Sequence, residues 1–266
     1  HALLTEPRPE HGYCVDDMAR VLVVTARAAV APDVQRLTEL SLRFLLAAQH
    51  DDGLCHNRRN PDGSWGDAAT TDDHWGRSLW ALGTAYVELD DPVERALAHD
   101  GVQRAMQARS RWPRAMAYAV LGAHQVLRRD PDDRAARRLL ADARPSLSRV
   151  ATSQAWPWPE QRLTYANAVL PEAMIVLGTT LEQPGLRAQG LALLGWLLDL
   201  QTSDGHLSVV PVAGLGRHDT RGGFDQQPIE VACLAEACRT AYGATSVAGW
   251  ISTRMIFSGV FAATSS

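Results

Sequence analysis

The chain has 266 residues, 46% of them hydrophobic and 21% charged, which predicts one soluble globular domain with a substantial core, or at most two small ones. Its 30 acidic and 26 basic groups are interspersed and give a net charge of −4, which excludes a strongly basic, nucleic-acid-binding chain. No apolar run approaches 18 residues, so we expect no membrane partner. The polar beginning of the sequence does not resemble a secretory signal, and we expect a cytoplasmic protein.

Helical periodicity dominates the chain, and we take the elements in order. The first helix opens with two carboxylates, which the helix dipole favours. Pro32 marks the break before the second helix, Pro113 suits a first helical position, and Pro145 predicts a kink. One short strand is expected within 206–214. The predicted helices cover 16–30, 33–49, 73–90, 92–110, 113–129, 132–152, 167–181, 185–201 and 228–242.

A weak internal repeat joins two distant parts of the chain. Residues 45–57 and 197–209 both contain Leu-Leu-x-x-Gln-x-x-Asp-Gly, where a second helix of a hairpin enters a long loop. Repeated helical hairpins are typical of solenoids and closed toroids, and long loops are commonly functional. The pattern therefore predicts an all-α fold of consecutive helical hairpins.

The cysteines and histidines give no metal or redox motif. Four cysteines are too few for a disulfide framework and match no zinc or thioredoxin spacing, so we expect them reduced and buried. The histidines His11, His56, His74, His206 and His218 are scattered, without ligand spacing on one helix. We assign no metal and no cofactor.

Four polar segments interrupt the helical pattern, at 10–17, 56–77, 156–167 and 222–230. Their acids have a structural explanation, because helix starts tolerate carboxylates. Asp16 or Asp17 would cap the first helix, and Asp72 or Asp73 the third. Adjacent residues diverge by about 100° on a helix, so only one of Asp16 and Asp17 can face a shared pocket. With Pro228 first and Gln227 as the cap, Glu230 has the place of a capping-box glutamate.

Aromatic residues in the same segments favour a different interpretation. Flat ring faces beside carboxylates, amides and arginines suit sugar rings, although each tryptophan alone is also explained by core packing. In WPWP the prolines hold the chain extended, so its two tryptophans cannot both follow the core stripe of a helix. The aromatic residues are Tyr13, Trp65, Trp75, Trp156, Trp158, Tyr165 and Phe224.

The sequence resembles a family of α/α-toroid sugar-active domains at four stretches: EHGYCVDDMAR, DDHWGRSLWALG, WPWPEQRLTYANAVLPEA and GGFDQQPIE. The likeness runs from about residue 5 to 242, and relatives often occur fused to, or beside, bacterial glycosyltransferases. Within this group it resembles actinobacterial hydrolases of methylated α-mannan-type polysaccharides. The resemblance implies a single toroid domain over 1–266, of five to six hairpins around a central carbohydrate cleft. Residues 243–266 lack the Asn-Gln-Gly motif of larger members, which implies an open cleft for an internal stretch of polysaccharide, or lost activity.

A glycoside hydrolase needs two carboxyl groups flanking the scissile bond. In a toroid the first and last inner helices are neighbours, so we expect Asp17 and Glu230 to be the pair, with Asp16 as the substitute for Asp17. We expect inversion, with carboxyl groups about 6.5–9.5 Å apart, and favour Glu230 as the acid. Asp73, Glu160 and Asp225 are reserve carboxylates. The predicted substrate-binding residues are His11, Tyr13, Asp73, Trp75, Arg77, Trp156, Trp158, Glu160, Tyr165, Asn167, Phe224, Asp225, Gln226 and Gln227.

The sequence is also compatible with three other functions. The first is a non-catalytic carbohydrate-binding or scaffold domain that serves a glycosyltransferase. The second is a sugar epimerase or lyase on a similar toroid, with His11 or His206 as the base. The third is a terpenoid-cyclase-like toroid, which the many amides and arginines disfavour. We expect an oligosaccharide or polysaccharide as the partner molecule, and no nucleic acid.

Overall fold

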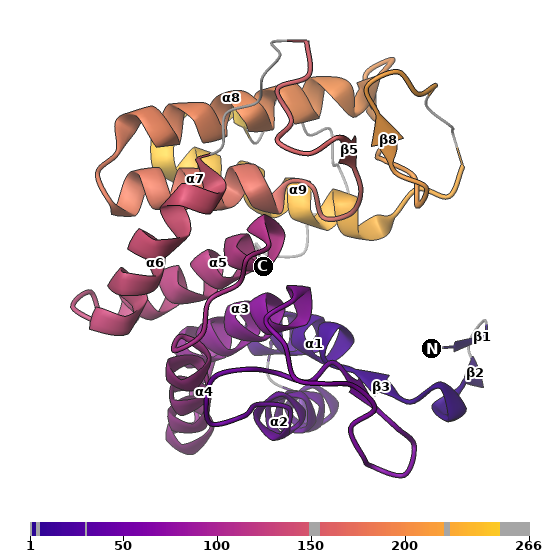
Figure 1. Cartoon of the computed structure of the whole chain (residues 1–266), viewed down its shortest axis with the longest axis vertical. Coiled ribbons are helices and arrows are strands. Elements are labelled where there is room, and N and C mark those ends of the chain that lie inside the picture. Colours follow the sequence, from indigo (N-terminus) through magenta and orange to yellow (C-terminus); the bar gives the residue numbers. More distant parts are fainter. Residues whose placement is uncertain (1, 4–5, 30, 149–154, 221–223, 251–266) are drawn as a thin grey trace. The chain divides into compact units, whose positions relative to one another are not determined.

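The computed structural model describes residues 2–3, 6–29, 31–148, 155–220 and 224–250, and they form two compact units (Figure 1). The first unit spans 1–147 and the second 148–266. Helices dominate both, so the predicted all-α fold class is confirmed. The expectation of a single domain stays a prediction. Within the described part of the chain, no helix combines the length and the apolar character needed to cross a membrane.

The first unit is built from three helical hairpins. Helices α1, α3 and α5 pack in a row, α1 on α3 and α3 on α5. Helix α2 packs on α1, α4 on α3, and α6 on α5. The helices of this unit are α1 (Val15–Arg27), α2 (Pro32–Ala47), α3 (Asp73–Glu88), α4 (Pro92–Ala105), α5 (Pro113–Arg129) and α6 (Arg134–Leu147).

Glycines bring α3 and α5 unusually close. A Cβ atom on Gly83 would lie 2.4 Å from the carbonyl oxygen of Gly122, and one on Gly122 would lie 2.3 Å from that of Leu79. No side chain fits at such distances, so the two backbones are in direct contact. Nearer the N-terminal turns, a Cβ atom on Gly76 of α3 would lie 2.2 Å from the carbonyl oxygen of Ala115 of α5, so these turns are also in direct contact, where polar residues gather.

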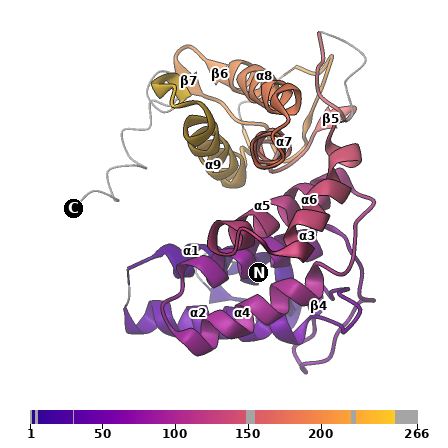
Figure 2. The ribbon, with the colours of Figure 1, turned by 90° about the vertical axis from the view of Figure 1, so that its left-hand side faces the viewer.

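The second unit contains a hairpin and a further helix. Helix α7 (Val169–Thr180) packs on both α8 (Pro184–Leu200) and α9 (Pro228–Thr245), and the short helix η2 (Ala248–Trp250) packs on α9 (Figure 2). Helix α7 is buried along almost its whole length, as its apolar sequence predicts. The N-terminal turns of α7 and α9 therefore lie side by side.

Proline positions explain most of the helix starts. Proline occupies the first position of α2, α4, α5, α8 and α9, where its missing N–H costs nothing. Helix α4 ends at Ala105 instead of 110. Helix α6 covers Arg134–Leu147 instead of 132–152, ending two residues after Pro145. The last residues of that predicted range, 149–152, lie outside the described residues.

The strands are all two residues long and pair antiparallel. The predicted strand within 206–214 reduces to β7 (His206–Leu207), paired with β6 (Thr202–Ser203). Tyr13 of β3 (Tyr13–Cys14) pairs with Arg59 of β4 (Arg58–Arg59), and β5 (Arg162–Leu163) pairs with β8 (Leu215–Gly216). The remaining short elements are β1 (Ala2–Leu3), β2 (Glu6–Pro7) and η1 (Pro9–His11).

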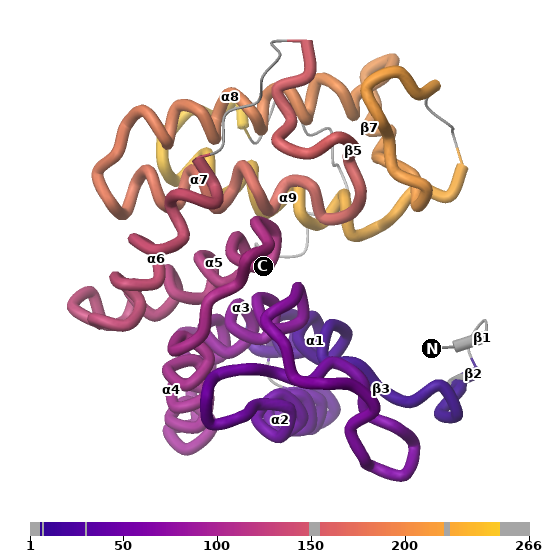
Figure 3. The backbone as a smooth tube through the Cα atoms, in the orientation of Figure 1, coloured from indigo at the N-terminus to yellow at the C-terminus, as the bar shows by residue number. Residues whose placement is uncertain are grey.

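The internal repeat forms a small hairpin in each unit, with pairing that differs by one residue: Cys55 pairs with Gln49, whereas its counterpart Leu207 pairs with Thr202. In the first unit a long loop joins α2 to α3 (Figure 3). At the start of this loop, Gln49 pairs with Cys55. In the second unit, β6 and β7 follow α8 in the same way. Gly53 (φ +85°) and Gly205 (φ +77°) occupy matched positions of the two turns in the left-handed region, which explains the repeated Asp-Gly.

Candidate functional site

The predicted site residues are divided between the units, and each unit holds a polar cluster at the N-terminal ends of its odd-numbered helices. We call the first-unit cluster Asp16, Asn57, Asp73, Arg77 and Tyr118. We call the second-unit cluster Thr164, Asn167, Gln227 and Glu230.

Arg77 is the centre of the first-unit cluster. Its side chain is 6% exposed, and its Nη1 donates to Asp16 Oδ1 at 2.5 Å. Asp73 Oδ2 lies 3.9 Å from Arg77 Nη2, and the guanidinium lies 5.1 Å from the ring centre of Tyr118 on α5. Asn57 Nδ2 donates to the other oxygen of Asp16 at 3.2 Å.

The charge of Arg77 is held by its neighbours. Burial by itself lowers the pKa of Arg77, but Tyr118, Asp16 and Asp73 together outweigh burial and raise the pKa above its ordinary value. The guanidinium therefore stays cationic between two carboxylates. A buried cation with fixed donors is suited to orienting an anionic or hydroxyl-rich group, and here it first of all orients Asp16.

Asp17 points elsewhere, as adjacent positions on a helix require. Its side chain is 59% exposed and accepts from Cys14 Sγ at 3.0 Å and from Arg20 Nη2 at 2.5 Å. Burial raises the pKa of Asp17, but the hydrogen bonds from Cys14 and Arg20 outweigh it and lower the pKa overall. Burial, and after it the hydrogen bond to Asp17, raises the pKa of Cys14 to about 11. The pair is thus a carboxylate beside a neutral thiol.

The predicted capping roles of the acids are wrong. The residue at the N-cap of α1 is Cys14, so neither Asp16 nor Asp17 occupies it. Asp72 occupies the N-cap of α3 without a side-chain capping bond, and instead accepts from Trp112 Nε1 at 2.7 Å. Asp73 is drawn toward Arg77. Side chains of Arg77, Arg20 and Trp112 bind these carboxylates in place of the backbone N–H groups at the helix starts.

Three aromatic or imidazole predictions in the first unit have different outcomes. Tyr13 is exposed on β3, and His11 is exposed with its Nε2 3.9 Å from Glu10 Oε1, so both remain available to a ligand. Trp75 is fully buried and donates from Nε1 to the carbonyl oxygen of Ala105 at 3.2 Å. The prediction that Trp75 stacks on a sugar ring is therefore wrong, because it fills the core next to α4.

Glu230 and Asn167 are the centre of the second-unit cluster. Glu230 has no exposed surface, although it lies in the first turn of α9. Its carboxylate accepts from the backbone N of Asn167 at 3.3 and 3.4 Å, and from Nδ2 at 2.8 Å. Asn167 Oδ1 accepts from the backbone N of Thr164 at 3.0 Å. No side-chain capping bond forms at Gln227. The buried Glu230 is held instead by Asn167, which lies just before α7.

Hydrogen bonding corrects the role predicted for Asn167. Its Nδ2 donates to Glu230 and its Oδ1 accepts from the backbone N of Thr164, so the amide is occupied within the protein and the predicted contact with sugar hydroxyls is wrong. Its amide instead positions the carboxyl group of Glu230, because a buried polar group needs hydrogen-bond partners. Gln227 joins the segments before α7 and before α9, because its Nε2 donates to the carbonyl oxygens of Thr164 at 3.1 Å and Pro211 at 3.3 Å.

The loop before α9 presents its side chains outward. Phe224 is 87% exposed, and Asp225 is exposed with φ +57°. Gln226 is exposed and donates from Nε2 to Ser208 Oγ at 3.1 Å. These three residues are accessible to a ligand.

The tryptophans of WPWP pack around a third tryptophan on α8. Trp156 and Trp158 contact Trp196 of α8, with ring centres 5.3 and 6.2 Å apart. Trp158 is buried and donates to Glu160 Oε2 at 3.3 Å, so its predicted stacking on a sugar is wrong. Trp156 is half-buried and donates to the carbonyl oxygen of Glu160 at 3.0 Å. Tyr165 is exposed.

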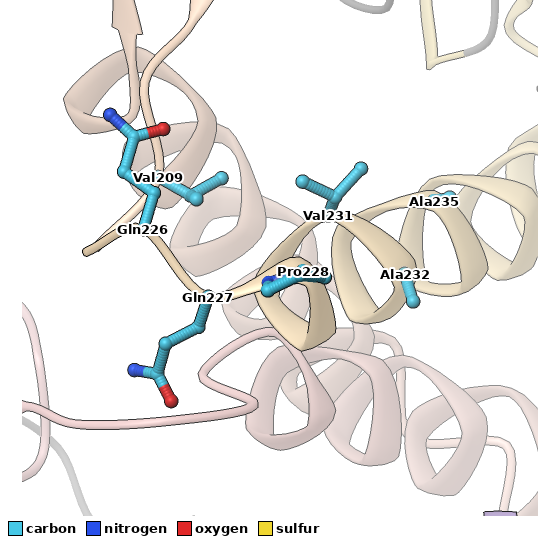
Figure 4. A pocket seen from close by; sticks show the side chains of 7 residues that line it. All are labelled: Val209, Gln226, Gln227, Pro228, Val231, Ala232 and Ala235. Atoms are coloured by element: carbon cyan, nitrogen blue, oxygen red, sulfur yellow. The ribbon is translucent and has the colours of Figure 1, made fainter. Parts of the chain in front are cut away.

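A cavity of about 490 Å³ lies beside the start of α9 (Figure 4). Positions 228, 231, 232 and 235 follow one face of the helix, whereas position 230 points to the opposite side, toward α7. The cavity and the Glu230 carboxylate therefore lie on different sides of α9. The cavity is lined by Val209, Gln226, Gln227, Pro228, Val231, Ala232 and Ala235.

Residues that sequence reasoning missed lie far from their partners in the chain. Asn57 binds Asp16, which is 41 residues away in the sequence. Tyr118 contacts Arg77 from a different helix, α5. Only the polar character of segment 56–77 gave a signal for Asn57. Among the described residues, no group of three or more His, Cys, Asp or Glu side chains is arranged to hold a metal ion.

Comparison with known proteins gives a similarity of fold to solved structures. No family model matches the sequence, and no curated protein sequence matches it. A solved structure of a sugar epimerase from a ruminal bacterium is similar, with a TM-score of 0.66 and 12% sequence identity. The match covers 95% of this chain and 76% of that chain. At this identity the similarity shows a shared fold.

Proposed function

We propose that this chain is an enzyme that acts on carbohydrate, and specifically an inverting, endo-acting glycoside hydrolase of α-linked, mannose-type polysaccharide. The shared fold with a sugar epimerase supports a sugar as the substrate class. The observation that carries the proposal is Glu230, a fully buried carboxyl group placed in the first turn of a helix and held by a dedicated amide. A group so costly to bury is typical of functional sites.

In the proposed reaction Glu230 is the general acid and protonates the glycosidic oxygen as the bond to the anomeric carbon breaks. The Asn167 donors then stabilise the carboxylate that remains after the proton has left. The general base takes a proton from the water that attacks the opposite face of the sugar. We assign this role to Asp17, because its lowered pKa keeps its carboxyl group ionised at neutral pH.

The alternative base, Asp16, is less suited to accept a proton. Both of its oxygens already accept hydrogen bonds, from Arg77 and Asn57. We therefore keep Asp17 as the proposed base and assign Asp16 as its substitute. Tyr13, Phe224, Asp225 and Gln226 are exposed and remain the proposed sugar contacts, with His11, Trp156, Tyr165 and Glu160 as further candidates.

The decisive experiment measures reducing ends released from α-mannan and short manno-oligosaccharides, with the anomer of the product followed by NMR. Glu230→Gln keeps the shape of the side chain and should lower kcat by at least a hundredfold while the folded protein still binds oligosaccharide. Asn167→Ala is the matched control, because it disturbs the same buried site without removing the acid. Full activity in the Glu230→Gln protein would remove Glu230 from the mechanism.

A sugar epimerase is the second candidate, favoured by the matched structure. It would use a histidine base, and His11 and His206 are both exposed. Incubation of monosaccharides and oligosaccharides in D₂O separates the two reactions. An epimerase exchanges a carbon-bound hydrogen for deuterium without releasing reducing ends, whereas a hydrolase releases them without exchange. Binding without either product would support a carbohydrate-binding domain working with a glycosyltransferase.

A further inference from the structure

Two histidines converge at the base of the long loop in the first unit. His50 and His56 place their Nε2 atoms 2.8 Å apart, with ring centres separated by 4.7 Å. The small hairpin explains the approach. His50 N donates to Leu54 O, and His56 N donates to Ala48 O, so residues 48, 50, 54 and 56 share one face.

His56 is held in a defined orientation. Its Nδ1 lies 2.7 Å from the carbonyl oxygen of Asp67, which only accepts, so Nδ1 carries the proton. The Nε2 atom of His56 therefore has a lone pair directed at His50. The ring also stacks on Trp65, with 5.1 Å between centres and 4° between planes.

The way His56 is held is typical of a metal-binding histidine. A ligating imidazole commonly donates its other N–H to a carbonyl or carboxylate, which fixes the tautomer and the ring direction. Two imidazole nitrogens bound to one zinc ion at about 2.05 Å in tetrahedral geometry are about 3.3 Å apart. His50 is exposed, so it can move the half ångström that separates the observed pair from this distance.

The second hairpin shows that the fold does not need these histidines. In the repeat of residues 45–57 at 197–209, His50 corresponds to Thr202 and His56 to Ser208. The turn around Gly205 forms with these hydroxyl residues, and β6 pairs with β7. The imidazole pair is thus an addition to the common hairpin.

We infer that His50 and His56 form a binding site for a divalent transition metal ion such as zinc, with two protein ligands and water in the remaining positions. Binding requires His50 to present the lone pair of Nε2, so its proton moves to Nδ1 through solvent and no net charge changes. Zinc affinity should fall at acid pH because protons compete for the same lone pairs.

The test is zinc titration by calorimetry, with long-range ¹⁵N NMR of the imidazole nitrogens. The double variant His50→Thr/His56→Ser restores the residues of the second hairpin and should lose one bound zinc ion per chain. Each single change should weaken the binding of that zinc ion at least tenfold. It should also reduce the shift that zinc causes in the Nε2 signal of the remaining histidine. His206→Ala and His218→Ala are the controls and should bind as the parent does.

Two results would overturn the inference. Unchanged zinc stoichiometry and affinity in the double variant would place the ion elsewhere. Nε2 signals of His50 and His56 that do not move on zinc addition would do the same. Circular dichroism of the double variant excludes unfolding as the cause of lost binding.

Discussion

At the scale of single residues, Asp16 and Asp17 show how one step along a helix decides chemistry. Asp16 accepts from a buried arginine and an asparagine, whereas Asp17 accepts from a thiol and an exposed arginine. The sequence showed only that the two must diverge. Their partners come from positions up to 61 residues away, and these partners determine which carboxylate is held rigidly.

Cys14 should titrate about two pH units above an ordinary thiol, since burial and Asp17 raise its pKa to about 11. Alkylation by iodoacetamide, followed by mass spectrometry, should give a midpoint near that value. Asp17→Asn removes one acceptor and its charge, so the midpoint should fall toward 9. An unchanged midpoint in that variant would show that Asp17 does not act on the thiol.

The same shift makes stability depend on alkaline pH. The unfolded chain releases the Cys14 proton near pH 9 and the folded chain near 11. Between these values the unfolded state binds fewer protons, so the free energy of unfolding falls as pH rises. Cys14→Ser should remove that part of the decline in urea denaturation.

Arg77→Met should destabilise the protein by about 3–5 kcal/mol, because it leaves two partly buried carboxylates without their cation. Arg43→Met is the matched control. Arg43 pairs with Glu39 at 2.6 Å, but both side chains are exposed, so the cost should be below about 1 kcal/mol. Equal losses of stability in urea denaturation would contradict the assigned role of Arg77.

At the scale of elements, the repeated hairpin gives a pair of turns that differ in their surroundings. Gly53 and Gly205 both have positive φ. A Cβ atom on Gly53 would meet the carbonyl oxygen of Arg104 at 2.7 Å, whereas one on Gly205 has nothing within 4 Å. The two turns therefore separate backbone strain from steric contact.

Gly205→Ala should cost about 1–2 kcal/mol, the price of a left-handed residue with a side chain. Gly53→Ala should cost clearly more, since the hairpin must also move away from α4. Thermal unfolding of the two variants measures the difference. A smaller loss for Gly53→Ala than for Gly205→Ala would show that the contact with Arg104 does not constrain the turn.

At the scale of the whole molecule, the open question is whether the two compact units behave as the one predicted domain. A single domain should unfold in one cooperative transition. Arg77→Met lies in the first unit and Asn167→Ala in the second. If the prediction is correct, both changes shift the same calorimetric peak. Two peaks, each moved by only one of the variants, would show two domains.

The sequence by itself determined most of the helices, the all-α fold class and the internal repeat with its Asp-Gly turns. These features depend on local patterns: apolar periodicity, proline at first helical positions and glycine in left-handed turns. Helix ends were less accurate, as at α4 and α6, because long-range packing competes with weak local signals at the ends.

Only the tertiary structure decided what individual polar and aromatic residues do. Trp75 and Trp158 were indistinguishable from exposed aromatics until helix packing buried them, and Asn167 became a partner of Glu230 only when α7 met α9. Burial and hydrogen bonding join residues far apart in the chain, whereas a sequence pattern reports on near neighbours. That difference in range is why the fold was readable from the sequence and the roles of the site residues were not.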